Sequence, residues 1–561
     1  MIGFQESQAP HFFKALAAHE RQTTVKKWVY VPYDQLNTSL GPVCELAPSE
    51  TGIILIESLA KGKRRPYHQQ KLALILCNQR HFALEQAQIG YRIHYAMTAD
   101  SYANTLQQIY KVTGQIHMME AAEYELRKEL EPLIQEGVIR LHPNETWLTQ
   151  EADFDAGTKG KRPWRMDLFY QYLRRKTNIL MENGKPVGGK YSLDGENRKP
   201  WKGTPPAPQL PRFQPDPIAL EAKALIEKVF HNHIGTIDLN HLPCTQAHAE
   251  SLWRWVQDEC LVNFGPYEDA MSTQSKTLFH SCLSPLINLN RLLPKRIIND
   301  VLALDLPLSS KEGFIRQVLG WREFMRHVHR KTHGFRRLEE QEWSSEVSPC
   351  AKWGHPRPAH STSDGGSLIN ALDYQTPLPE AFWGKESGLN CLDHVVNQVM
   401  ETGFTHHIPR LMVLANIATL LEIQPREITD WFWVSFIDAY DWVVEPNVLG
   451  MGTYATGPLF TTKPYIAGSN YINKMSDFCK ECAFHPKKTC PITRLYWAFL
   501  ERHKSKFKSN FRLSMILRTL DKRSPDNKAL DAFAFEQVRR QLGNAQSLTP
   551  ESLTRQPVET K

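Results

Sequence analysis

A change in the hydrophobic pattern near residue 145 constrains the fold of this chain more than any other feature. Before it, short apolar runs rich in β-branched residues alternate with segments whose apolar residues recur every three or four positions. Such runs are typical of buried parallel strands, and the segments between them are typical of helices that cover a sheet. The predicted strands span residues 27–33, 52–58, 91–97, 115–121 and 138–143. Residues 27–144 are therefore predicted to form a doubly wound, Rossmann-like α/β domain.

After residue 145 the pattern changes. Residues 145–215 are rich in Pro and Gly and are predicted to be an extended interdomain linker. From residue 216 to residue 543 helical periods continue with no clear strand, which predicts a large all-α domain. We expect the two ends of the chain, residues 1–26 and 544–561, to be disordered.

Length and composition agree with a multidomain protein that does not span a membrane. At 561 residues the chain is long enough for roughly two to four domains, each with its own core. The mean hydropathy is −0.44, and the most apolar stretch, residues 411–423, falls short of the roughly 18 apolar residues that a span needs. No signal peptide is evident, so we expect a cytoplasmic protein. The net charge of +7 permits a polyanionic partner without establishing one.

Three cysteines near the C-terminus form the sharpest local motif, Cys479-x2-Cys482-x7-Cys490. Two thiolates three positions apart can bind one metal centre, and the third cysteine adds a further ligand. A proline follows the last cysteine, as it does in iron–sulfur ligation. The fourth ligand must come from elsewhere, and the spacing leaves two alternatives open. These are an iron–sulfur cluster completed by Cys391 and a structural zinc completed by His485.

Several longer segments are shared with a known family. They are MSDFCKEC and CPITRLYWAFLERH around the cysteines, GFTHHIPRLMVLANIATL, DAYDWVVEPNVLGMG, FIRQVLGWREFMR and RRKTNILMENGKPVGGKYSLDGENR. With them the chain resembles the iron–sulfur bacterial cryptochromes and photolyases, the prokaryotic (6-4) photolyase branch of the cryptochrome/photolyase family. The resemblance extends over residues 27–542. It implies an α/β antenna domain, a linker and a helical FAD-binding domain, which agrees with the hydrophobic pattern.

The resemblance implies two cofactors in the helical domain. A 4Fe-4S cluster would be held by Cys391, Cys479, Cys482 and Cys490. FAD would be held by a segment similar to the family's TSxLSP motif, by aromatic-rich motifs and by an Arg–Asp pair beside the isoalloxazine. The residues implied for FAD are Tyr267, His280, Ser281, Leu283, Ser284, Trp321, Arg322, Arg410, Asp438 and Tyr440. Val444 stands where the family places a polar group facing flavin N5, and a backbone shift would let Glu445 take that place.

The resemblance also implies residues that recognise damaged DNA. His406 and His407 would face the lesion, with His407 as the proton donor and His406 orienting it. Tyr465 and Tyr471 would line the pocket for a flipped dinucleotide, which needs aromatic walls once it leaves the base stack.

The resemblance also implies residues for electron transfer and for light capture. Trp383 and Trp431 match an electron-transfer pair that leads from the flavin to the surface. In the α/β domain a light-harvesting 6,7-dimethyl-8-ribityllumazine would lie near Asp34, Gln35, Ile56 and Glu57. The stretch 61–65, Lys-Gly-Lys-Arg-Arg, is basic where relatives place an acidic contact.

The function implied is that of a (6-4) DNA photolyase, a carbon–carbon lyase. Such an enzyme repairs UV-damaged DNA with an electron from light-excited, reduced FAD. The alternative is a cryptochrome-like blue-light photoreceptor that binds FAD and signals without repair. The adjacent histidines, His406 and His407, disfavour a cyclobutane-dimer photolyase. We expect a monomer that associates with the nucleoid when it is bound to damage.

Overall fold

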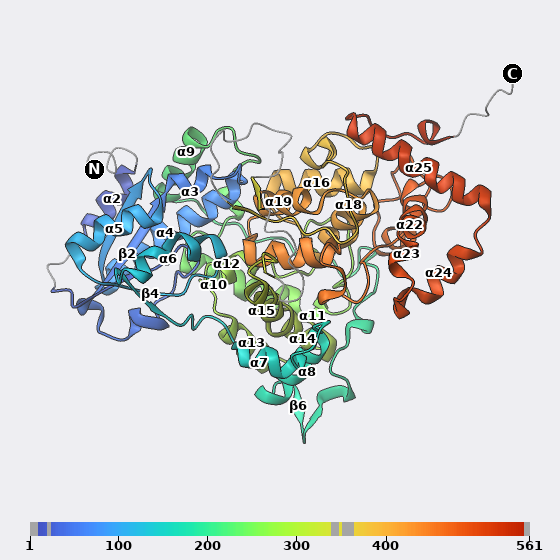
Figure 1. Cartoon of the computed structure of the whole chain (residues 1–561). Coiled ribbons are helices and arrows are strands. Elements are labelled where there is room, and N and C mark those ends of the chain that lie inside the picture. Colours follow the sequence, from blue (N-terminus) through green and yellow to red (C-terminus); the bar gives the residue numbers. More distant parts are fainter. Residues whose placement is uncertain (1–8, 20–23, 338–346, 350–363, 555–561) are drawn as a thin grey trace.

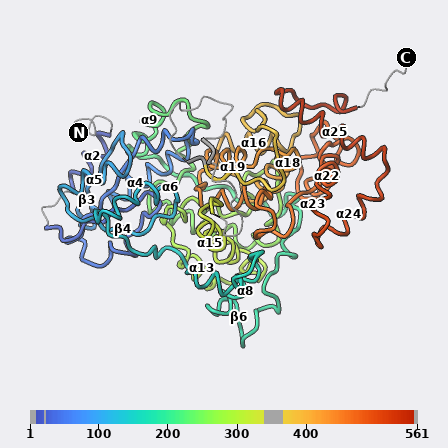
Figure 2. Tube along the Cα trace, in the orientation of Figure 1, coloured from blue at the N-terminus to red at the C-terminus, as the bar shows by residue number. Residues whose placement is uncertain are grey.

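The computed structural model describes residues 9–19, 24–337, 347–349 and 364–554. Figure 1 shows an α/β part, coloured blue to cyan, beside a larger helical part, coloured green to red. The Cα trace in Figure 2 leaves the α/β part, passes through the segment around α8 and β6, and returns to α9 beside the α/β part. Within the described residues no helix has the length and apolar composition that a membrane crossing requires.

The α/β part is built on a five-stranded parallel sheet with the strand order β3-β2-β1-β4-β5. The strands are β1 (Lys27–Tyr30), β2 (Thr51–Ser58), β3 (Arg92–Thr98), β4 (Ile116–Met119) and β5 (Ile139–His142). Each coincides with one of the five predicted runs. Val29 of the central strand is paired with Ile53 on one side and His117 on the other. The predicted doubly wound α/β domain is confirmed.

Alternate residues of β2 point into two separate cores, as the period of a strand requires. The helices that cover the sheet are α3 (Leu59–Lys63), α4 (Gln69–Ile89), α5 (Tyr102–Thr113) and α6 (Tyr124–Gln135). Ile53 and Leu55 belong to the core that contains α4, whereas Ile54 and Ile56 belong to the core of α5 and α6. Because both faces are covered, this strand is apolar along most of its length.

Residues 10–17 form helix α2, so the expectation of a disordered lead-in is wrong for this segment. Phe12 is fully buried in the core that α2 shares with α4 and α9 (Pro217–Val229). The backbone N–H groups of His11 and Phe12 donate to the two oxygens of Glu221, at 2.8 and 3.3 Å. These contacts come from residues about 200 positions away, which local composition cannot reveal. Residues 1–8 and 20–23 of the predicted lead-in lie outside the described residues.

The segment predicted as a linker, residues 145–215, begins with helices rather than with extended chain. Its elements are α7 (Glu151–Thr158), α8 (Met166–Thr177), β6 (Met181–Glu182) and β7 (Lys185–Pro186). Phe154 of α7 and Phe169 of α8 are fully buried in a core of the helical part. The linker prediction is therefore wrong for the first half of the segment. The Pro-rich second half has little regular structure.

The remainder of the described chain is almost wholly helical, as predicted. The helices after α9 are α10 (Gln246–Trp255), α11 (Leu261–Phe264), α12 (Ser284–Asn288), α13 (Pro294–Ala303), α14 (Leu308–Ile315), α15 (Glu323–Thr332), α16 (Asn390–Thr402), α17 (His407–Pro409), α18 (Asn416–Leu420), α19 (Pro425–Ser435), α20 (Asp441–Val444), α21 (Ser469–Met475), α22 (Pro491–Arg502), α23 (Lys504–Phe507), α24 (Ser514–Asp521) and α25 (Pro525–Gly543). Wide, π-helical turns interrupt them at η6 (Val256–Cys260), η7 (Arg316–Arg322), η9 (Arg410–Ala415) and η10 (Glu445–Gly452). A small antiparallel pair, β8 (Val347–Pro349) and β9 (Asp364–Ser367), is the exception.

The start of the predicted disordered tail packs back on the helical part. The N–H of Leu548 donates to the carbonyl of Ser387 at 2.8 Å, and the Leu548 side chain is buried. The expectation is therefore wrong for residues 544–554, and residues 555–561 lie outside the described part.

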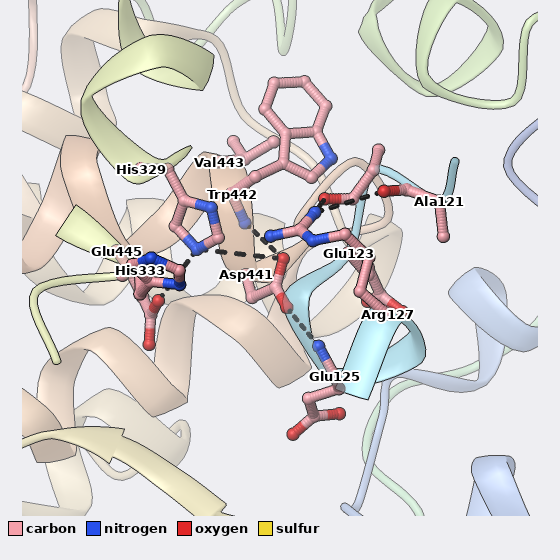
Figure 3. Close-up of polar contacts among 12 residues, drawn as sticks. Ala121, Glu123, Glu125, Arg127, His329, His333, Asp441, Trp442, Val443 and Glu445 are labelled. Atoms are coloured by element: carbon pink, nitrogen blue, oxygen red, sulfur yellow. Dashed lines mark hydrogen bonds and ion pairs between the residues drawn. The ribbon is translucent and has the colours of Figure 1, made fainter. Parts of the chain in front are cut away.

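A buried polar network joins the two parts of the molecule (Figure 3). Asp441 at the start of α20 accepts the backbone N–H of Glu125 in α6, at 3.1 Å. His329 of α15 lies 4.0 Å from the Asp441 carboxylate and 3.0 Å from that of Glu445. Burial raises the pKa of Asp441 well above its usual range, and the nearby carboxylates add to this. Since buried polar groups must find partners, the network fixes α6 against α15 and α20.

We expect Phe12→Ala to destabilise the protein by about 3 kcal/mol, because it removes a fully buried ring and leaves a cavity under α2. Urea denaturation followed by tryptophan fluorescence measures the change. Val112→Ala on α5, where the side chain is 86% exposed, is the matched control and should change stability by less than about 0.5 kcal/mol. Equal effects of the two substitutions would contradict an anchoring role for α2.

Candidate functional site

A cavity of about 270 Å³ lies in the helical part, between segments that are far apart in the chain. Its walls come from α12 and the residues before it, from η7, from the start of η9 and from the region around α20. Most of the residues implied for FAD are brought together here. Those that line the cavity are His280, Ser281, Leu283, Ser284, Trp321, Arg322, Arg410 and Asp438.

An arginine–aspartate pair holds one wall of this cavity together. Arg410 and Asp438 are joined twice, with Nη1–Oδ1 at 2.9 Å and Nη2–Oδ2 at 3.0 Å. Ser284 Oγ donates to the same carboxylate at 2.6 Å, and Asn288 Nδ2 donates to the Asp438 carbonyl at 3.0 Å. Arg410 Nε donates to the carbonyl of Thr405 at 2.7 Å. The pair therefore fixes α12, η9 and the turn after α19 relative to one another.

Three of the π-helical turns, η7, η9 and η10, carry cavity residues. η7 ends with Trp321 and Arg322, and η9 begins with Arg410; such turns recur at functional sites because they shift the register of a helix locally. Arg322 packs over the ring of Trp147 at 4.0 Å, and burial lowers its pKa to about 10. Its Nε is buried and has no hydrogen-bond partner among the described residues. This nitrogen is therefore available to an anionic ligand.

Two residues implied for FAD do not line the cavity. Tyr267 stacks on Phe279, with ring centroids 5.3 Å apart, and its hydroxyl donates to the carbonyl of Thr204 at 3.2 Å. Tyr440 lies at the boundary with the α/β part, where its ring is stacked 6.4 Å from that of Tyr33. The chain turns between α19 and α20 and directs the Tyr440 ring toward Tyr33 of the α/β domain, and the role of Tyr440 toward FAD stays a prediction.

Three imidazoles meet at the cavity wall. His406 and His407 stand at the start of α17, and His280 comes from the loop before α12. The rings of His280 and His406 are stacked, with centroids 3.9 Å apart and planes at 14°. His407 lies edge-on, 5.3 Å from His280 and 6.1 Å from His406. His280, which the resemblance implied for FAD, therefore lies with the two histidines implied for the lesion.

The three imidazoles differ in their access to solvent. Two of them are buried, and burial lowers their pKa values well below the usual range, since each also faces other imidazoles. His407 is exposed at the cavity mouth. Its close surroundings lower its pKa by desolvation, with Arg316 and Arg410 acting in the same direction and Glu268 and Asp194 acting against it. His407 is therefore the imidazole that solvent can protonate most readily.

The two tyrosines implied for lesion recognition, Tyr465 and Tyr471, do not line the cavity. The hydroxyl of Tyr471 donates to Asp269 at 3.2 Å, and burial raises the pKa of Asp269 to about 6. The carboxylate of Asp194 acts electrostatically on Tyr465, on Tyr471 and on His407. Asp194 is thus an electrostatic neighbour that the three side chains have in common.

Neither Val444 nor Glu445 is among the residues that line the cavity. Although burial opposes it, Arg336 and other partners lower the pKa of the Glu445 carboxyl to about 2. Because Glu445 is committed to these partners, the suggestion that it shifts toward a flavin is wrong. The wall is lined instead by Val443 and Asn447. Asn447 is a polar cavity residue that sequence reasoning missed, and its position four residues after Val443 on one helix face was the available signal.

The tryptophans implied for electron transfer lie in the core behind the arginine–aspartate pair. Trp431 of α19 is fully buried and meets Phe436 edge-on at 5.9 Å. Phe436 in turn lies 4.2 Å below the guanidinium of Arg410. On its other side Trp431 contacts Phe382 at 5.5 Å, the residue before the partly buried Trp383. An aromatic path therefore leads from the cavity wall to Trp431 and toward Trp383.

The four cysteines implied for a cluster converge. Cys391, at the start of α16, is buried in one core with Cys479, Cys482 and Cys490. Burial and the three neighbouring sulfurs raise the pKa of Cys391 well above its usual value. Within the described chain no three of these sulfurs lie within 4.8 Å of one another, whereas a tetrahedral zinc would hold its sulfurs about 3.8 Å apart. His485 Nδ1 accepts the backbone N–H of Lys487 at 3.2 Å, so a zinc at this place would have to use the other nitrogen of that ring.

The α/β domain contains a much smaller cavity, of about 60 Å³, which has room for a few water molecules. Of the antenna residues implied, Glu57 lines it, and Asp34, Gln35 and Ile56 do not. Glu57 is moreover held by Arg80, at 3.0 and 2.8 Å. As they are arranged, these residues do not fit a ribityllumazine.

The basic stretch 61–65 is matched by acidic residues on α6. Lys61 donates to Glu123 at 2.9 Å, and Arg65 pairs with Glu125 at 2.5 Å. Lys61 and Glu123 both line the small cavity, so much of the charge in this stretch is paired within the chain.

Comparisons with known proteins agree with this architecture. The family model described as "Deoxyribodipyrimidine photo-lyase-related protein" matches residues 29–242. Among solved structures, a bacterial class III photolyase from Agrobacterium tumefaciens has a TM-score of 0.51 at 16% identity, covering 93% of this chain and 99% of that chain. An archaeal photolyase from Sulfolobus tokodaii has a TM-score of 0.50 at 11% identity, covering 93% and 95%. At these identities the two structures show a shared fold.

A curated (6-4) photolyase of Agrobacterium fabrum is more similar in sequence. It is 32% identical over 514 residues, which cover 88% of this chain and 95% of that protein. Identity at this level over nearly the whole of both chains, together with the fold, confirms the family predicted from the sequence motifs. The chain belongs to the cryptochrome/photolyase family.

Proposed function

We propose that this protein is a light-dependent photolyase that repairs (6-4) photoproducts in DNA. The observation that carries the proposal is the meeting, in one cavity, of the His406–His407 pair with the Arg410–Asp438 pair. The first can move a proton near neutral pH, and the second can hold a flavin ring at a fixed place. The Agrobacterium fabrum relative, which bears the name (6-4) photolyase, supports the same assignment.

FAD is the cofactor that we propose for the cavity. The hydroxyl of Ser281 and the unpartnered Nε of Arg322, both on its described walls, suit the phosphates of a dinucleotide. The archaeal structure with the same fold is named as holding two FAD molecules. When bound, FAD supplies light-driven donation of one electron. The chain itself would hold and orient the flavin through Arg410 and Asp438, and Trp431 would lie on a path for its reduction.

The histidines would supply the proton that repair requires. His407 stands at the mouth, where solvent can protonate a ring nitrogen, and the buried ring of His406 limits its movement. Tyr465 and Tyr471 would meet the flipped bases beside the same mouth. Flipping costs a few kcal/mol and costs least at damaged pairs, so the pocket selects lesions without reading sequence. The net charge of +7 favours a DNA partner.

We further propose that the four converging cysteines hold a 4Fe-4S cluster. The cluster would tie Cys391 of α16 to the segment before α22, some 90 residues later in the chain. A link that closes so long a loop favours the folded state.

Repair is tested by illuminating the reduced protein with an oligonucleotide that contains one (6-4) photoproduct and following loss of the lesion by chromatography. We expect turnover, and we expect His407→Ala to lower its rate by about 100-fold or more because the proton donor is lost. His231→Ala, which removes an exposed imidazole elsewhere, is the matched control and should repair normally. Absence of turnover in the unaltered protein with intact flavin absorbance would favour the photoreceptor alternative.

The rate of repair should depend on pH through His407. The donor must carry a proton, and its pKa is lowered from the usual value, so the protonated fraction falls as pH rises above that pKa. We therefore expect a higher repair yield per absorbed photon at pH 6 than at pH 8, with the flavin kept fully reduced. A yield that rises with pH would contradict His407 as the donor.

Cys391→Ser should remove most of the bound iron and the visible absorption of the cluster, because it deletes the ligand that comes from α16. Iron analysis and absorption spectroscopy of the purified protein measure this loss. Cys44→Ser, at an exposed cysteine of the α/β domain, should leave both unchanged. Zinc in place of iron in the unaltered protein would decide for the structural-zinc alternative.

A further inference from the structure

The three imidazoles of His280, His406 and His407 are grouped in a way that suits a metal ion, which the proposed repair reaction does not require. Each ring offers one nitrogen, and these three nitrogens all lie within 4.8 Å of one another. We propose that the three imidazoles form a binding site for a borderline divalent transition-metal ion, of which Zn²⁺ is the representative, with an open coordination position toward the cavity.

The spacing of the nitrogens is close to what such an ion needs. Zn–N bonds of about 2.0–2.1 Å at tetrahedral angles place the ligand nitrogens about 3.4 Å apart. The largest separation present therefore has to shrink by no more than about 1.4 Å. Rotation of the two stacked rings about their Cβ–Cγ bonds provides movement on this scale without a change of backbone.

Two of the ring nitrogens lack any other partner. His280 Nε2 and His406 Nδ1 are buried with no hydrogen bond to any described residue, although the side chains are only 6% and 5% exposed. A buried polar nitrogen left in this state is costly, and a metal ion bound through these two atoms would satisfy both.

The chemistry of the donor set selects the class of ion. Three imidazole nitrogens suit zinc, copper and nickel, whereas Mg²⁺ requires oxygen ligands and keeps its water. The surrounding charge is mixed, since Glu268 and Asp194 face His407 from one side and Arg316 and Arg410 from the other. Because burial keeps the rings neutral, they need not release protons to accept a metal.

Occupancy of this site has a consequence for repair, which rests on the proposed function. A metal ion between His407 and His406 would take the place where the lesion meets its proton donor. Metal and lesion would therefore exclude one another.

The site is tested with the full chain carrying its flavin and its iron, so that the cysteines are already occupied. Calorimetric titration with Zn²⁺ should show one specific site that His280→Thr weakens by about tenfold or more. Mg²⁺ should give no such site. A crystal soaked in Zn²⁺ should show anomalous density, at the zinc absorption edge, between the three rings.

Two further variants allow the site to be tested even if His280→Thr does not fold. His407→Asn alters the exposed ligand and should weaken Zn²⁺ binding even if His280→Thr loses its flavin and is judged misfolded. His142→Asn is the matched control, because His142 and His117 form another imidazole pair, with ring nitrogens 2.9 Å apart, in the α/β domain. It should leave the isotherm unchanged.

An isotherm that neither cavity variant changes, or anomalous density found away from the three rings, would overturn the site. Failure of repair in the unaltered protein would count against the proposed function alone, because Zn²⁺ binding is measured without DNA. If repair is present and Zn²⁺ binds, loss of lesion binding with added Zn²⁺ should be reversed by a chelator.

Discussion

The cavity depends on the double contact between Arg410 and Asp438. Arg410 begins η9 and Asp438 lies in the turn after α19, and their contact also engages Ser284 and Asn288 of α12. Removing one partner would leave a charge in a mostly buried place, which costs far more than the pair itself contributes. The pair therefore specifies how three segments meet, and the histidines at the start of α17 take their places from it, since Arg410 lies three residues after His407.

The α/β domain supports the same wall from behind. Lys71 of α4 donates to the carbonyls of Trp433 and Ala439, at 3.0 and 2.5 Å, on either side of the turn that carries Asp438. Burial lowers the pKa of Lys71 to about 7. With the network around Asp441 in Figure 3, these contacts make the domain boundary a set of buried polar groups that satisfy one another. The α/β domain thus helps to shape the cavity even though its own small cavity does not fit a lumazine.

Much of the architecture could be predicted from the sequence, because burial on both faces of a strand leaves a local record. The run GIILIES marked β2, and the periods that include Leu72 and Leu126 marked α4 and α6. Helix α2 was missed although Phe12, Phe13 and Leu16 pack on one core, because the helix is short and its partners, such as Glu221, lie far away in the chain. The helices α7 and α8 were missed because the segment that contains them, residues 145–215, is rich in Pro and Gly.

For the candidate site, the sequence by itself determined which residue types are present: an arginine and an aspartate, adjacent histidines, and a cysteine motif with one distant partner. Only the tertiary structure decided that His280 stacks on His406, that Tyr440 faces the α/β domain and that Glu445 is committed to Arg336. The physical reason is that periodicity and composition report whether a residue is buried. Which distant segments meet there is settled by packing and by the pairing of buried charges over long separations in the chain.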